Sequence, residues 1–152
     1  MRVAVTALTV TLATAACSGG DSSEEQARLP TSADSVAMAE AMYDEAGFDT
    51  ISWETHTVAL ERGAVVWRFS CRKCHGEGGA GDGGFVVDGD TLRPPTFLAD
   101  DFRFAEDRVG LRHQIYTGTE SSMPHWGPEG LPYRDIDAVS FHILETLRSA
   151  DG

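Results

Sequence analysis

The sequence contains two cysteines separated by two residues and followed at once by a histidine: Cys71, Cys74 and His75. Cysteine and histidine each make up only about one or two per cent of an average protein, so a chain of this length matches the pattern by chance on the order of one time in a thousand. Two thiols and an imidazole on one short segment can take part in binding a single prosthetic group or metal ion. The rest of the fold has to accommodate that group.

Three kinds of site use paired cysteines at this spacing. A thioredoxin-like redox pair lies in a βαβ unit and does not need the histidine. A structural zinc site needs two further ligands, usually a second close pair of Cys or His, and the sequence contains no such pair. The C-x-x-C-H pattern is the haem-attachment signature, in which the thiols bond to the haem vinyl groups and the histidine binds the iron. It predicts one covalent haem c at Cys71 and Cys74, with His75 as an axial ligand.

The N-terminal residues predict export. An apolar run at residues 3–16 is too short to span a bilayer as a helix, so we expect a signal peptide over residues 1–16. The Ala-Ala-Cys sequence at residues 15–17, followed by a stretch rich in Ser and Gly, resembles a bacterial lipobox. The resemblance implies a lipid on Cys17 and an anchor on the periplasmic side of a membrane. Cleavage near the A-x-A pattern at residues 13–15 would instead give a soluble periplasmic protein.

Acidic residues outnumber basic ones by 24 to 12, so we expect a surface that is negative at neutral pH. Such a surface repels phosphate backbones, which argues against nucleic acid as a partner, and it favours redox protein partners with basic docking surfaces. The chain has three cysteines. Because Cys17 is assigned to the lipid and the other two to the haem motif, no thiol remains for a disulfide across the domain.

Apolar residues recur at helical spacing in four segments, and no segment alternates as a strand does. The first, residues 32–46, carries Met38 and Met42 on one face, where we expect them to pack against a neighbouring element. The last has Asp135 as its expected N-cap. We therefore expect an all-α fold, with irregular chain rich in Gly and Pro at residues 76–95. The expected helices are residues 32–46, 57–71, 106–117 and 136–147.

With this motif and this order of helices, residues 57–150 resemble a class I cytochrome c domain. The helix before the motif, with Gly63 and Trp67, resembles the first helix of that family, and residues 136–147 resemble its last helix. The resemblance implies a cytochrome c fold, with three to five helices around one covalent haem and with the first and last helices of the domain crossing. Residues 17–56 would then form a lipid-anchored tether with a short amphipathic helix.

The family resemblance also implies a second axial ligand, a methionine on a loop after the haem motif. Met123, which is followed by proline, resembles that ligand, and no other methionine follows the motif. A thioether stabilises ferrous iron relative to a second imidazole and so raises the reduction potential. The alternatives are that Met123 only packs against the porphyrin, or that His125 binds the iron in its place.

Other residues are expected to surround the haem. In the same family a proline carbonyl accepts a hydrogen bond from the proximal histidine, and Pro94 or Pro95 would do this for His75. The sequence does not distinguish between the two prolines, and both also predict a rigid turn. Trp126 is expected to shield a haem face, to donate to a propionate, or simply to be buried.

The expected function is that of a mono-haem electron carrier tethered outside the cytoplasmic membrane. An iron with both axial positions filled has no open site for catalysis, so we expect no enzyme activity. A fixed haem subunit of a larger respiratory or dehydrogenase complex is the first alternative, because a diffusing carrier has no evident need for the helix at residues 32–46. A gas-binding haem sensor is the second, and it requires a methionine that is absent or displaceable.

Overall fold

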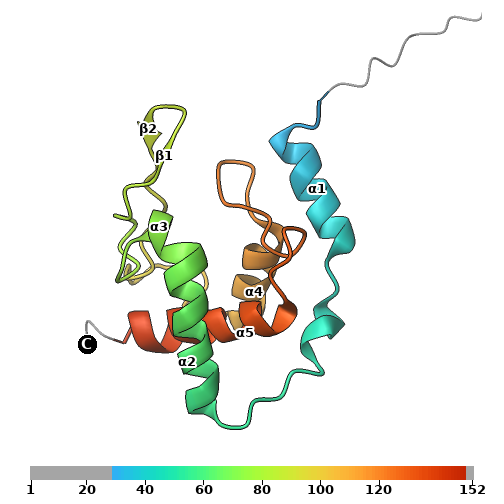
Figure 1. Cartoon of the computed structure of the whole chain (residues 1–152), viewed down its shortest axis with the longest axis vertical. Helices are drawn as coiled ribbons and strands as arrows, with labels where there is room; N and C mark the ends of the chain where they lie inside the picture. Colours follow the sequence, from blue (N-terminus) through green and yellow to red (C-terminus); the bar gives the residue numbers. More distant parts are fainter. Residues whose placement is uncertain (1–28, 150–152) are drawn as a thin grey trace, which may run out of the picture.

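The computed structural model describes residues 29–149, so the expected signal peptide and Cys17 lie outside the described residues. The regular secondary structure of this part of the chain is helical apart from one short β-hairpin (Figure 1), and none of its helices is long and apolar enough to cross a membrane. The turn η1 is a 3₁₀ helix, whereas η2 and η3 are π-helical turns that continue α2 and α5. In chain order the elements are α1 (Ser32–Met42), η1 (Glu45–Phe48), α2 (His56–Val66), η2 (Trp67–Cys71), α3 (Arg72–His75), β1 (Val86–Val87), β2 (Asp90–Thr91), α4 (Arg108–Thr117), α5 (Tyr133–Phe141) and η3 (His142–Leu147).

Helices α2 and α5 cross and form the most extensive contact between two elements of the fold (Figure 1). The crossing depends on Gly63, because a Cβ atom there would lie 2.2 Å from the carbonyl oxygen of Ala138 and 2.7 Å from Cβ of His142. Only a residue without a side chain permits so close an approach. On α5, Ile136 and Val139 are fully buried in the core. The predicted all-α fold, with the first and last helices of the domain crossing, is confirmed.

Side chains cap three of the α-helices, including α1 through Thr31, but not the last one as predicted. Thr55 caps α2 and Asp107 caps α4, each by accepting a hydrogen bond from a backbone amide of the first turn. The prediction that Asp135 caps the last helix is wrong, because α5 has Pro132 at its N-cap. The Asp135 carboxylate is instead paired with the guanidinium of Arg62 on α2, with an Nε to Oδ1 distance of 2.8 Å. This ion pair joins the two crossing helices.

The stretch rich in Gly and Pro contains an antiparallel hairpin of β1 and β2. Its turn residues, Asp88 and Gly89, have φ of 52° and 91°, as an Asp-Gly hairpin turn requires. The prediction that residues 76–95 are irregular throughout is wrong at this point. Two strands of two residues each are too short to show the alternation from which strands are predicted.

The N-terminal helix is shorter than predicted, since α1 ends at Met42 and η1 follows as a separate turn. Met38 and Met42 are 54% and 53% exposed, so the prediction that they pack against a neighbouring element is wrong. Ala39 is the residue of α1 that is buried, and α1 contacts α4. The hydroxyl of Tyr116 on α4 donates to the carbonyl of Met42 at 3.1 Å. The end of α1 is thereby fixed to α4.

A second contact joins the segment before α2 to the core. The indole Nε1 of Trp53 donates to Oδ2 of Asp137 on α5 at 2.8 Å. Asp137 is 4% exposed, and its Oδ1 accepts from Arg108 at 2.8 Å and from Arg112 at 3.1 Å. A carboxylate this buried needs such partners, because removing an unpaired charge from water is costly. Trp53 thus packs into the α4 and α5 contact.

Candidate haem-binding site

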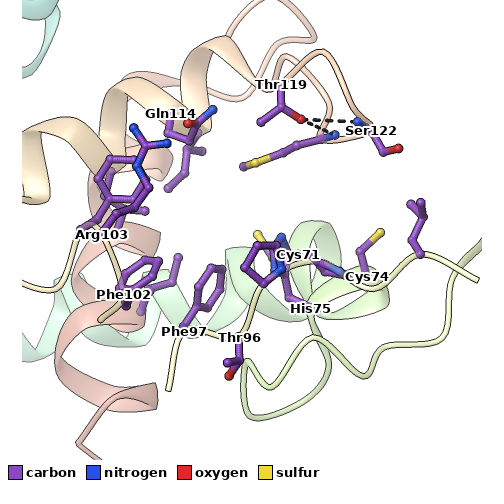
Figure 2. Close-up of a pocket in the computed structure, with 18 of the residues that line it drawn as sticks. Cys71, Cys74, His75, Thr96, Phe97, Phe102, Arg103, Gln114, Thr119 and Ser122 are labelled. Atoms are coloured by element: carbon purple, nitrogen blue, oxygen red, sulfur yellow. Dashed lines mark hydrogen bonds between the residues drawn. The ribbon is translucent and has the colours of Figure 1, made fainter. Parts of the chain in front are cut away.

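A cavity of about 810 Å³ lies between α3 and the loop that follows α4. This volume is within the range of pockets that hold cofactors. Figure 2 shows the two cysteines and His75 on one side of the pocket, with Thr119 and Ser122 on the opposite side. Most of its lining is apolar and comes from helices, from η3 and from the segment that follows β2. The large apolar side chains include Trp67, Leu92, Phe97, Phe102, Leu111 and Ile143.

Cys71 and Cys74 both line the cavity, and neither forms a disulfide. Cys71 ends the π-helical turn η2, and Cys74 lies on α3 directly after it. Burial, with a smaller effect of the neighbouring Cys74, raises the pKa of the Cys71 thiol to about 12, and burial also raises the pKa of Cys74. Both thiols are therefore protonated at neutral pH. A thioredoxin-like redox pair needs a thiolate, so this geometry does not fit one.

The imidazole of His75 stacks on the ring of Phe97, with ring centroids 4.7 Å apart and 23° between the planes. Burial lowers the pKa of His75 to about 4, so the ring is neutral at pH 7 and keeps a nitrogen lone pair for a metal. Its Nδ1 atom is buried and has no hydrogen-bond partner within residues 29–149. The prediction that a Pro94 or Pro95 carbonyl accepts a hydrogen bond from this ring is therefore wrong for this structure.

The packing of the glycine-rich loop accounts for where the Pro94 carbonyl lies. Gly81 has a φ of +81°, and a Cβ atom there would lie 2.2 Å from the carbonyl oxygen of Pro94. The amide of Gly81 also donates to the carbonyl of His75 at 2.8 Å. The loop therefore packs backbone to backbone between His75 and Pro94, while Pro94 and Pro95 line the cavity.

Met123 lies on the loop after α4 and lines the same cavity. Its amide donates to Oγ1 of Thr119 at 3.1 Å, and its carbonyl accepts from the Thr119 amide at 3.1 Å. His125, two residues further on, does not line this cavity, and its Nδ1 donates to the carbonyl of Thr117. Of the two candidate axial ligands, Met123 is the one that shares a cavity with His75.

Several residues that the sequence did not single out also line the cavity, among them Phe97, Arg103 and Gln114 (Figure 2). Trp126, which was expected near the haem, lines it as well. Phe97 and Arg103 lie in irregular chain, where a lone aromatic or basic residue carries no periodic signal. Gln114 lies on α4, but a polar residue on a half-buried helix predicts a surface position. No sequence pattern would have identified these three.

The side chains present fit a haem better than a bare metal ion. Within residues 29–149, no group of three or more His, Cys, Asp or Glu side chains is placed to hold a metal ion. The cavity instead offers two thiols, a neutral imidazole and a thioether around a large apolar space. A macrocycle that brings its own iron and needs covalent and axial bonds matches this set of groups.

The family model of cytochrome c oxidase, cbb3-type, subunit III matches residues 58–143, which is more than half of the chain. No curated protein matches the sequence. The helical fold and the family match together define a c-type cytochrome domain, an electron-transfer domain that carries covalently bound haem c. The chain belongs to the family of cbb3-type cytochrome c oxidase subunit III.

Proposed function

We propose that this protein is a single-electron carrier, with one haem bound covalently at Cys71 and Cys74 and with His75 and Met123 as the axial ligands of its iron. The proposal rests on one observation: these four side chains line the same apolar cavity, although Met123 comes from a separate loop. Haem c supplies reversible one-electron exchange between ferrous and ferric iron. The remaining parts of the site concern how this chain holds and tunes that group.

His75 and Met123 would have different tasks. Burial keeps the His75 imidazole neutral, and Phe97 fixes the plane of its ring. The two hydrogen bonds to Thr119 hold the backbone of Met123, which restricts where its thioether reaches. With both axial positions filled by protein, no coordination site is left for a substrate, which is why we propose electron transfer rather than catalysis.

The surroundings of the iron would raise its reduction potential. Pro94, Pro95 and Trp126 line the cavity together with the large apolar side chains. An apolar environment disfavours the more highly charged ferric state, and a thioether ligand acts in the same direction. Both effects suit a carrier that gives and takes electrons reversibly.

The ligand assignment is tested by replacing Met123 and its competitor separately. Met123→Ala should lower the reduction potential by roughly 100 mV or more, because axial ligands tune haem potentials over a range of about 0.8 V. His125→Asn, which removes the imidazole but can still donate to the Thr117 carbonyl, should leave the potential close to that of the wild type. If His125→Asn lowers the potential and Met123→Ala does not, His125 is the ligand and this assignment fails.

A second candidate function is that of a fixed haem subunit in a larger respiratory complex. The match to a subunit family favours it, and so does the N-terminal segment, which makes hydrogen bonds to α4 and α5 through Met42 and Trp53. A haem domain that only diffuses has no evident need for that segment. Purification from the native membrane distinguishes the two, because a fixed subunit copurifies with other chains and a free carrier does not.

We further propose that the protein is exported and anchored by a lipid on Cys17, with residues 17–56 leading to a haem domain at residues 57–150. The lipobox-like sequence supports the anchor. Its proposed partners are redox proteins with basic docking surfaces, for which the net charge of −12 is the support. Cell fractionation tests the anchor: wild type should be found with membranes, and Cys17→Ser should be released. Release of the wild type would favour the soluble alternative.

A further inference from the structure

Arg103 occupies one end of the cavity. Figure 2 shows its side chain at the end of the pocket away from Cys74, near Gln114. The guanidinium stacks on the neighbouring ring of Phe104, with its central carbon 4.4 Å from the ring centroid. Arg103 is exposed and also lines the cavity, so its guanidinium reaches both the cavity and solvent.

Arg103 has no ion pair or hydrogen bond within residues 29–149, although carboxylates outnumber basic side chains by 24 to 12 in this chain. Asp101 lines the same cavity and lies two residues away, yet it does not pair with Arg103 either. Four other arginines of the domain form ion pairs with carboxylates. They are Arg62, Arg72, Arg108 and Arg112.

Two polar side chains that line the cavity, Gln114 and Thr119, already have hydrogen-bond partners. The amide nitrogen of Gln114 donates to the carbonyl of Gly118. The hydroxyl of Thr119 accepts from the amides of Ser122 and Met123 (Figure 2). Two arginines that line the cavity, Arg93 and Arg103, have no hydrogen bond or ion pair within residues 29–149, and Arg103 is the one at the end of the pocket away from Cys74 (Figure 2).

The chemistry of haem c would direct its acidic groups toward the end of the pocket away from the cysteines. The vinyl groups that become thioethers lie on two adjacent pyrrole rings, and the two propionates lie on the other two rings, at the opposite edge. A haem joined to Cys71 and Cys74 would therefore direct its carboxylates away from the cysteines. A guanidinium offers a planar pair of N–H donors that matches a carboxylate.

We propose that Arg103 is the charge partner of a haem propionate. Through this pairing it would raise the reduction potential of the iron. The inference rests on the proposed haem site. A paired propionate has part of its negative charge compensated, so it stabilises ferric iron less than a free propionate does. Loss of the Arg103 charge should therefore favour the ferric state and lower the potential.

The test compares Arg103→Gln with Arg68→Gln in holoprotein. Arg68 is a matched control because it is also exposed and also stacks on an adjacent ring, that of Phe69, with its carbon 4.9 Å from the centroid, but it does not line the cavity. Arg103→Gln should lower the ratio of ferrous to ferric protein at a fixed ambient potential by roughly threefold to tenfold. It should also shift the propionate bending band in the resonance Raman spectrum. Arg68→Gln should change neither.

A third variant and a second arginine make the outcome decisive. Arg103→Lys keeps the charge but not the planar pair of donors, so it should restore most of the potential while the propionate band stays shifted. Arg93, which also lines the cavity, is the competitor. The proposal is overturned if Arg103→Gln leaves the band and the potential unchanged, or if Arg93→Gln produces the changes in its place. A wild type without attached haem would instead refute the haem site itself.

Discussion

The crossing of α2 and α5 can be tested at Gly63 with a single added methyl group. In Gly63→Ala the new Cβ would lie 2.2 Å from the Ala138 carbonyl oxygen and 2.7 Å from Cβ of His142. Ordinary van der Waals contact begins at about 3.4 Å. The neighbour is backbone, which cannot rotate away as a side chain does. The two helices would therefore have to separate, on the order of 1 Å at this point.

Two opposing effects set the size of the change in stability. Alanine in place of glycine inside a helix is intrinsically favourable by about 1 kcal/mol. Overpacking a close contact costs typically about 1–3 kcal/mol, and the upper part of that range applies where the backbone itself has to move. We therefore expect Gly63→Ala to lower the free energy of unfolding by about 1–2 kcal/mol.

Urea unfolding of the holoprotein, followed by circular dichroism, measures this change as a lower midpoint at an unchanged slope. Gly78→Ala is the matched control, because a Cβ at Gly78 would meet nothing within 4 Å and its φ is not positive. The control should stay within about 0.5 kcal/mol of the wild type. A Gly63→Ala protein as stable as the wild type, or more stable, would refute the close crossing.

Two further predictions concern charge. Burial lowers the pKa of His142 below its ordinary value of 6.5, so the unfolded chain takes up the proton first as the pH falls. The stability that the neutral His142 side chain contributes is complete above pH 6.5 and is lost as the pH falls below it. The free energy of unfolding should therefore fall more steeply with acidification in the wild type than in His142→Gln. Parallel curves would contradict this. For the partner, electron transfer to a basic redox protein should slow as salt is raised, in stopped-flow measurements, because the chain carries a net charge of −12. A rate independent of ionic strength would argue against electrostatic docking.

Local patterns in the sequence were sufficient for the helices and for the haem-attachment motif. The α2 to α3 segment shows this, because its apolar spacing and the Cys71, Cys74 and His75 motif lie in one stretch of chain. The contact at Gly63 could be predicted only through the family resemblance. A glycine within a helical pattern does not by itself indicate which element approaches it.

Long-range contacts and short elements could not be predicted in this way. Asp135 precedes an apolar helical pattern and so predicts an N-cap, but a tertiary ion pair with Arg62 uses its carboxylate instead. The bond from Trp53 to Asp137 joins parts of the chain whose patterns are independent of each other. Arg103 is one of many exposed charges in the sequence, and only the cavity distinguishes it from Arg68.

The most direct test of the central claim is the visible spectrum of the reduced wild-type holoprotein before and after addition of carbon monoxide. We expect no change, because with His75 and Met123 in both axial positions the iron would be closed to exogenous ligands. The same addition to Met123→Ala should give the spectrum of a carbon monoxide complex. A shifted spectrum in the wild type would contradict the account, since an open iron belongs to a gas sensor or an enzyme rather than to an electron carrier.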